Sequence, residues 1–262
     1  MVNWLGHYIP GRSPIHKLDP RVKIVGLVLY SVALLTAPTA TATVVLGASI
    51  VPAIFLSGLA PSFIWRQLRP ILLFLMAIFA FQAAVTPGEV IARVGPIGVT
   101  REGINYGFLG GARVSYLLLA AALLTATTDP LTLADGLEKL LRPGEKLGLP
   151  AAELALMLTM ALRFVPTLLD EAERIMRAQL ARGASFQGGK IKNLMPLIIP
   201  LFVSAFQRAE ALAEAMEARG YQGSKGRTRM RELHFTRGDG LFLLTNVLLA
   251  FGSLYYRLKF GR

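Results

Sequence analysis

The chain has 262 residues, of which 53% are hydrophobic and only 17% are charged, yet it carries a formal net charge of +12. Soluble globular domains have roughly 25% charged residues, so this composition favours an integral membrane protein with a basic face, or a basic protein with a large core. There is no cysteine, which excludes disulfides, zinc–thiolate sites, iron–sulfur clusters and thiol nucleophiles. With only three histidines (His7, His16 and His234), most histidine-based metal and acid–base chemistry is also disfavoured.

The distribution of charge decides between these two classes. The segment from Ile24 to Trp65 has no charged residue over 42 positions. As one helix it would be about 63 Å long, twice the roughly 30 Å of a hydrocarbon core, so it predicts two membrane spans. Pro38 separates them, because proline lacks an N–H and restricts the residue before it. A pair of soluble core helices would have a polar outer face, and this segment has none.

Five apolar stretches predict an all-α integral membrane protein with about five transmembrane helices and, between the fourth and fifth, long cytoplasmic helices. The predicted spans are 24–36 with some extension, 41–59, 70–88, about 104–128 and 241–256. Two further apolar stretches, 154–162 and 194–206, are short and bounded by charges, so we expect them not to span. The predicted divisions are therefore 1–128 with four spans, 129–238 in the cytoplasm, and 239–262 with the last span and a basic tail.

Basic residues predict the orientation. The segment before the first span has four basic residues against Asp19, and the connection after the second span has Arg66 and Arg69. The positive-inside rule places the N-terminus and an Arg66–Arg69 turn in the cytoplasm. Five spans then leave the tail, with Arg257, Lys259 and Arg262, outside and against that rule. If 194–206 also spanned, the tail would be inside.

Two long helices, about 151–182 and 193–219, are predicted from the helical spacing of their apolar residues. Both end in the same tripeptide, Ala181-Arg182-Gly183 and Ala218-Arg219-Gly220. Each ending alone is explained as a cap, since arginine suits a helix C-terminus and glycine readily adopts the left-handed conformation that follows it. Two matched endings in one region also indicate an arginine presented to a partner at each helix end.

Small residues recur every fourth position along the fourth predicted span, at Gly103, Gly107, Gly111 and Ser115. Such a face lets another helix pack closely. Packing within this chain is favoured over a partner interface. Arg113, the one charge in this span, is expected near the membrane edge.

Several kinds of chemistry lack a candidate. The segment 183–191 resembles a phosphate-binding loop, but its lysine is one place late and no Ser or Thr follows, so we expect no nucleotide site and no cofactor in this chain. No Asp, Glu or Lys lies within the five spans, which disfavours an ion relay. The basic cluster of Lys225, Arg227, Arg229 and Arg231 is expected to contact anionic lipid headgroups, not nucleic acid.

Five segments in order resemble the transmembrane T component of energy-coupling factor (ECF) transporters, which are modular ABC importers. They are YIPGRSPIHKLDPRVK at 8–23, TDPLTLADGLEKLLRP at 128–143, LRFVPT at 162–167, AQLARG at 178–183 and LAEAMEARG at 212–220. Each segment alone is weakly specific, whereas the ordered set is specific and covers nearly the whole chain.

The resemblance implies a non-catalytic scaffold in a prokaryotic cytoplasmic membrane. By residue-for-residue correspondence, Arg182 and Arg219 would be coupling arginines, each docked in a groove of one of two ABC ATPase subunits that bind ATP and Mg²⁺. The apolar faces of the same helices, including Leu158 and Leu162, would contact a separate S component that binds a vitamin or transition-metal ion. Two alternatives remain open: an integral membrane enzyme, and a self-sufficient secondary transporter.

Overall fold

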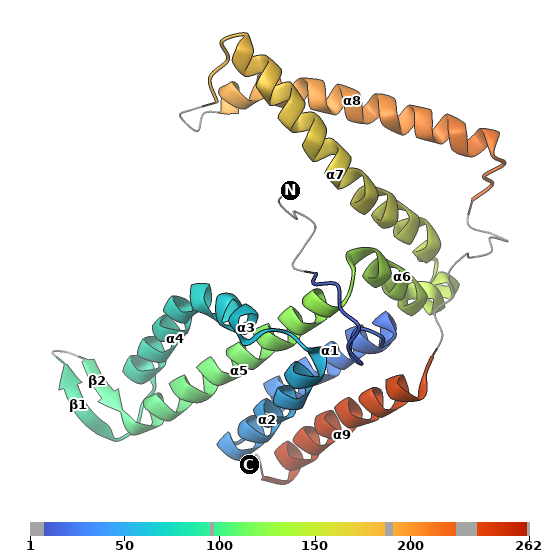
Figure 1. Ribbon diagram of the computed structural model, residues 1–262. Coiled ribbons are helices and arrows are strands. Elements are labelled where there is room, and N and C mark those ends of the chain that lie inside the picture. Colours follow the sequence, from blue (N-terminus) through green and yellow to red (C-terminus); the bar gives the residue numbers. More distant parts are fainter. Residues whose placement is uncertain (1–7, 95–96, 187–190, 224–234, 261–262) are drawn as a thin grey trace. The chain divides into compact units, whose positions relative to one another are not determined.

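A computed structural model gives the fold and describes residues 8–94, 97–186, 191–223 and 235–260. These residues are almost entirely helical (Figure 1). The elements are α1 (Pro20–Thr36), α2 (Ala40–Ser57), α3 (Pro61–Leu68), η1 (Arg69–Ile71), α4 (Leu72–Val85), β1 (Val90–Val94), β2 (Ile97–Thr100), α5 (Arg101–Thr127), α6 (Pro130–Leu141), η2 (Arg142–Leu147), α7 (Ala151–Ala181), α8 (Ile191–Ala218) and α9 (Arg237–Phe260). The prediction of an all-α integral membrane protein is confirmed, with one short hairpin added.

The chain forms two compact units. One contains α1 to α5, the hairpin and α9, and we call it the α1–α5/α9 unit. The other contains η2, α7 and α8, and we call it the α7/α8 unit. The boundary after Gly136 falls within α6.

The break predicted at Pro38 is present. α1 ends at Thr36, and the Thr39 hydroxyl accepts a hydrogen bond of 3.3 Å from the Ala42 amide to start α2. At the start of α1, a carboxylate oxygen of Asp19 accepts the Arg21 amide at 2.9 Å, with Pro20 in the first turn. Local capping therefore fixes the start of α1 and the start of α2.

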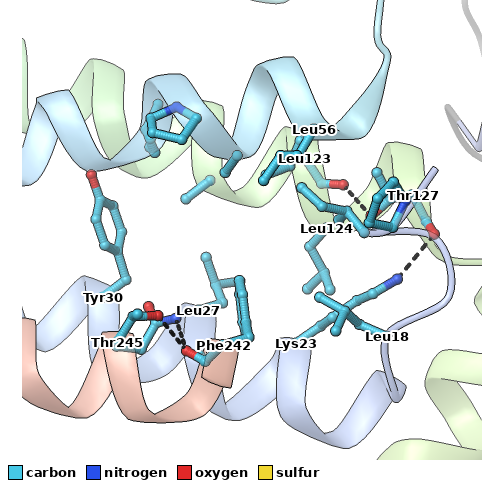
Figure 2. A pocket seen from close by; sticks show the side chains of 18 of the residues that line it. Leu18, Lys23, Leu27, Tyr30, Leu56, Leu123, Leu124, Thr127, Phe242 and Thr245 are labelled. Atoms are coloured by element: carbon cyan, nitrogen blue, oxygen red, sulfur yellow. Dashed lines mark hydrogen bonds between the residues drawn. The ribbon is translucent and has the colours of Figure 1, made fainter. Parts of the chain in front are cut away.

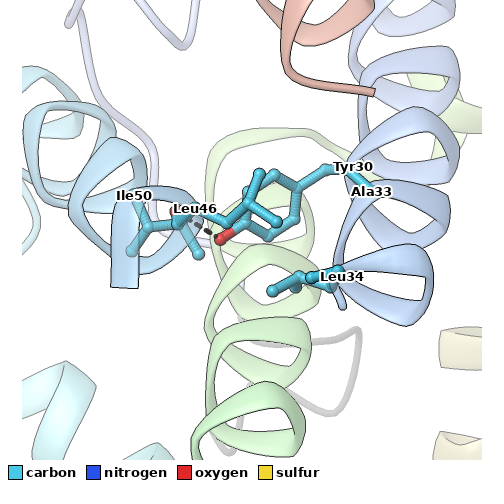
Figure 3. Close-up of a cluster of buried hydrophobic side chains, with 6 residues drawn as sticks. Tyr30, Ala33, Leu34, Leu46 and Ile50 are labelled. Atoms are coloured by element: carbon cyan, nitrogen blue, oxygen red, sulfur yellow. Dashed lines mark hydrogen bonds between the residues drawn. The ribbon is translucent and has the colours of Figure 1, made fainter. Parts of the chain in front are cut away.

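The core of the α1–α5/α9 unit lies between α1 and α2. It consists of Tyr30, Ala33, Leu34, Ala37, Leu46 and Ile50 (Figure 3). The Tyr30 hydroxyl donates a hydrogen bond of 2.9 Å to the Leu46 carbonyl, which satisfies a buried polar group. On α2, Gly47 lies so close to Tyr116 of α5 that a Cβ there would overlap the phenol ring. The absence of a side chain at Gly47 thus permits the α2–α5 contact.

Helices α1 and α9 pack side by side and run parallel. At their starts, the Asp19 amide donates to the Asp239 carboxylate at 2.7 Å. Near their ends, the Ser253 hydroxyl donates to the Ala33 carbonyl at 2.8 Å. Both pairs are separated by 220 residues, so the register is constant and the two helices end on the same side of the unit.

The segment predicted as a turn at Arg66–Arg69 is helical, with the 3₁₀ helix η1 joining α3 to α4. The chain turns earlier, at Gly58, which has φ 68° and closes α2, and Pro61 then starts α3. Arg66 lies within α3 and Arg69 within η1, and the helical segments continue to Val85. Glycine in the left-handed region ends a helix more decisively than two arginines do, because arginine is a good helix former.

The connection after α4 contains an antiparallel hairpin in which Val90 pairs with Thr100. This hairpin was not predicted. Its signals were β-branched residues on both sides of a Gly-Pro dipeptide at 95–96, which is typical of a turn.

Six helical segments among the described residues are long and apolar enough to cross a membrane. Four overlap predicted spans, and α7 and α8 are additional. The apolar stretches at 154–162 and 194–206 lie inside helices of 31 and 28 residues, so shortness is no argument against crossing. α1, with 17 residues, is outside this set of six.

Candidate functional site

The end of α7 is a Schellman motif built around Gly183. Gly183 has φ 85°, its amide donates to the Leu180 carbonyl at 3.0 Å, and the Ala184 amide donates to the Gln179 carbonyl at 3.0 Å. These two bonds satisfy carbonyls that a helix end otherwise leaves without donors. Arg182 is the C-cap residue, between the last helical residue Ala181 and the glycine.

The end of α8 repeats the same motif. Gly220 has φ 78°, its amide donates to the Glu217 carbonyl at 2.8 Å, and the Tyr221 amide donates to the Met216 carbonyl at 3.0 Å. Arg219, which follows the last helical residue Ala218, is therefore placed as Arg182 is. The prediction that Gly183 and Gly220 end these helices with positive φ is confirmed.

The two arginine side chains are exposed, and neither forms a hydrogen bond or ion pair within the described residues. By contrast, Arg177, one turn before Arg182, pairs with Glu173 at 3.3 Å on the same helix. The guanidinium groups of Arg182 and Arg219 keep their N–H donors available for a carboxylate or carbonyl acceptor. Helix capping therefore accounts for the two glycines, but it does not account for the two arginine side chains.

Helices α7 and α8 contact each other and leave long apolar faces exposed. α8 runs back across α7 (Figure 1). The end of α7 lies near the start of α8, so the two arginine-bearing helix ends are separated by the length of α8. The buried residues of α7 are Ala151 and Ala155 alone, whereas Leu158 is 39% exposed and Leu162 is half-buried. On α8, Phe202 and Phe206 are 60% and 66% exposed. Apolar area of this extent indicates contact with lipid or with a partner protein.

The small-residue face of α5 divides into two parts. A Cβ on Gly103 would lie 2.7 Å from the Gln82 carbonyl oxygen, and one on Gly107 would lie 3.1 Å from that of Phe79, so both glycines pack against α4. A Cβ on Gly111 would meet nothing within 4 Å, and the Ser115 hydroxyl donates to the Gly111 carbonyl at 2.8 Å. The structure therefore leaves the Gly111 end of this face open.

A buried polar cluster that sequence reasoning missed joins α9 to the start of α1. Asp239 is fully buried, and its carboxylate accepts the amides of Asp19 and Thr236 and the Thr236 hydroxyl, all at 2.7 Å. The Asp19 carboxylate in turn accepts a hydrogen bond from the Arg21 guanidinium group and forms an ion pair with it. A signal was available, since Asp19-Pro20 and Thr236-Arg-Gly-Asp239 are both typical helix starts. This cluster fixes the register of α1 against α9.

A cavity of about 700 Å³ lies between α1, α2, α5 and α9, lined chiefly by apolar side chains. Figure 2 shows Tyr30 and Lys23 at its two ends, with Leu123 of α5 and Phe242 of α9 along its walls. The Lys23 ammonium group donates to the Thr127 carbonyl at 3.1 Å and the Thr128 hydroxyl at 2.8 Å. Lys23 thereby ties α1 to the end of α5.

Two further features of the sequence remain to be located in the structure: possible metal ligands and the basic and loop-like segments. Within the described residues, no three His, Asp or Glu side chains gather as a metal site would require. The basic cluster at 225–231 lies outside the described residues, as do residues 187–190 of the loop-like segment.

The apolar helices define the class: the chain is a multi-pass membrane protein. Its relatives are transporter subunits. The family model for cobalt transport protein, CbiQ, matches residues 11–230. The energy-coupling factor transporter transmembrane protein EcfT of Heliobacterium modesticaldum is 46% identical over 239 residues, 90% of each chain. The protein of the same name from Thermosediminibacter oceani is 42% identical over 97% of both chains. The one from Bacillus subtilis is 41% identical over 94% of this chain and 95% of that protein.

The chain therefore belongs to the family of ECF transporter transmembrane (T) components. It is one subunit of a transporter complex that contains other subunits.

Proposed function

We propose that this chain is the coupling subunit of an ECF importer, which transmits ATP-driven motion of two ABC ATPase subunits to a substrate-binding S component. The observation that carries the proposal is the pair of identical helix ends with exposed arginines. Two equivalent ends suit a pair of related ATPases, because each end can occupy the same kind of groove. ATP and Mg²⁺ would bind to the ATPases, and this chain would have no catalytic group and no cofactor of its own.

Each tip, defined as Ala181-Arg182-Gly183 or Ala218-Arg219-Gly220, would dock through its arginine. Guanidinium is permanently charged and can bind a carboxylate with two parallel hydrogen bonds. The Schellman motif fixes the backbone on both sides of the arginine, so less conformational entropy is lost on docking than for a frayed helix end.

The S component would cover apolar surface that this chain leaves exposed. The candidates are the faces of α7 and α8, with Leu158 and Leu162, and the open end of the small-residue face at Gly111 and Ser115. The substrate, a vitamin or a transition-metal ion, would be selected by the S component. A membrane enzyme or a self-sufficient transporter has no comparable support, because either would need polar groups free to act on a substrate, whereas the polar cluster around Asp239 is occupied in joining α9 to α1.

We propose that the N-terminus and residues 129–238 face the cytoplasm of a prokaryotic cell, with anionic lipid contacts and no nucleic acid partner. The parallel packing of α1 and α9 constrains this topology. If both helices cross the membrane in the same direction, α7 and α8 must either both cross or both remain on one side. The basic tail then lies on the outer side in either case.

The proposal is tested by purifying the tagged chain from its native membrane and quantifying bound subunits by mass spectrometry. Arg182→Glu with Arg219→Glu should remove both ATPases while the S component still co-purifies. Arg177→Glu and Arg208→Glu, which reverse charges elsewhere on the same helices, serve as matched controls and should retain the ATPases. Wild-type amounts of both ATPases on the double variant would overturn the assignment of the tips.

A further inference from the structure

A second pocket, of about 430 Å³, lies where α1, α4 and α9 end beside the middle of α5. Two arginines line it, Arg113 from α5 and Arg257 from α9, which are 144 residues apart in the sequence. The remaining lining is Leu35, Thr36, Ala37, Pro38, Gln82, Thr86, Tyr106, Leu109 and Gly110, and it includes no acidic residue. The fold thus brings two positive charges to one pocket without a carboxylate among the lining side chains.

Arg113 is held in place by the first helical connection. Its Nη2 donates to the Ala37 carbonyl at 2.5 Å and its Nε donates to the Thr43 hydroxyl at 3.4 Å. Ala37 is the C-cap residue of α1, so Arg113 also offsets the partial negative charge of that helix end. A guanidinium has five N–H donors, so three remain on Arg113 after these two bonds.

Arg257, unlike Arg113, does not bind to a helix end. It is exposed, and it forms no hydrogen bond or ion pair in the part of the chain that the structure describes. Helix ends carry only about half a charge each and act over about one turn, so they do not balance two full positive charges in one pocket. The pocket therefore has two positive charges that a bound anion could balance.

We propose that Arg113 and Arg257 bind the phosphate group of an anionic phospholipid headgroup. Arginine binds phosphate through paired hydrogen bonds, and two arginines from different helices can clamp it from two directions. The surroundings favour a lipid as the source of the phosphate. Leu35, in the pocket lining, is 68% exposed and provides apolar surface for an acyl chain, and Tyr106 is 59% exposed, as aromatic residues at membrane interfaces are.

This site also accounts for the basic tail, which conflicts with the positive-inside rule. Arg257 lines the same pocket as Thr36, Ala37 and Pro38 at the end of α1, so it lies at the pocket and not in an isolated loop. A bound anion would make this basic residue favourable on that side of the membrane. The inference rests on the α1–α5/α9 unit alone and is independent of the proposed coupling function.

The test uses the purified full-length chain in neutral detergent and follows thermal unfolding while phosphatidylglycerol, phosphatidylcholine or inorganic phosphate is added. Phosphatidylglycerol should raise the unfolding temperature of the wild type. Arg257→Gln should need about tenfold more of it for the same shift, because a charge-assisted contact is lost. Lys259→Gln is the matched control, since Lys259 lies against the Tyr255 ring and does not line the pocket.

The outcomes separate the sources of the phosphate. Equal responses of Arg257→Gln and Lys259→Gln would overturn the site, as would equal shifts with phosphatidylcholine and phosphatidylglycerol. Stabilisation by inorganic phosphate at the concentrations at which phosphatidylglycerol acts would overturn the lipid assignment and support a free phosphate. Arg113→Gln should also weaken the response, and because Arg113 holds Ala37, its unfolding temperature without lipid is compared first.

Discussion

Arg182 and Arg219 occupy the same position in the same helix-ending motif, at the ends of two different helices. In both cases the arginine amide donates to carbonyls three and four residues earlier, and the next residue is a glycine with positive φ, 85° at Gly183 and 78° at Gly220. Over their last six residues the two sequences, AQLARG and AMEARG, agree at the first Ala and over Ala-Arg-Gly, so a short shared sequence gives the same local geometry twice.

Gly220→Ala should loosen the end of α8, because a non-glycine residue in the left-handed region costs about 1–2 kcal/mol. We expect faster amide hydrogen exchange at Tyr221 and reduced, not abolished, ATPase binding, since Arg219 is still present. Gly252→Ala, in an open helical position of α9, is the control and should leave both readouts unchanged. Unchanged exchange at Tyr221 would show that the cap does not depend on glycine.

Gly47→Ala should destabilise the α1–α5/α9 unit by about 1–3 kcal/mol, because its new methyl group would overlap the Tyr116 ring. Thermal unfolding in detergent measures this loss. Adding Tyr116→Leu should restore part of it, whereas Gly110→Ala, with no atom nearby, should be neutral. Strictly additive effects of the Gly47 and Tyr116 substitutions would contradict the close contact.

The two parts of the small-residue face should respond differently to the same substitution. Gly103→Val should lower the unfolding temperature of the isolated chain, because Cβ would lie 2.9 Å from the Cα of Ala83 on α4. Gly111→Val should leave the isolated chain nearly as stable and reduce co-purification of the S component. If Gly111→Val retains the S component fully, this end of α5 is not part of that interface.

Asp239→Asn should cost about 1–3 kcal/mol in stability, because one acceptor is replaced by an amide group that faces the donors of Thr236 or Asp19. Thermal unfolding again provides the measurement. Asp135→Asn on α6 removes an acidic charge without this buried cluster and is the control. Equal stability of the two variants would show that the Asp239 carboxylate is replaceable.

The sequence predicted those parts of the fold that depend on local signals. The ends of α7 and α8 followed from Gly183 and Gly220, and the break at Pro38 followed from the chemistry of proline. The segment at Arg66–Arg69 was predicted as a turn from its charge and is helical instead, and the break after α2 falls earlier, at Gly58 and Pro61.

Contacts between distant segments could not be predicted in this way. Asp19 with Asp239, and Arg113 with Arg257, are each brought together by the packing of α9. No periodicity within one helix specifies which neighbour it meets, or in which register, so these pairs became visible only in the structure.

The most direct test of the coupling assignment uses the absence of native cysteine. A single cysteine replaces Ala181, Ala218 or, as a control, Ala40 at the exposed start of α2. Each variant is assembled with its partner subunits and treated with a short thiol–amine cross-linker. We predict ATPase adducts from positions 181 and 218 and none from position 40. Assembled complexes that give no ATPase adduct from either helix end would contradict the account.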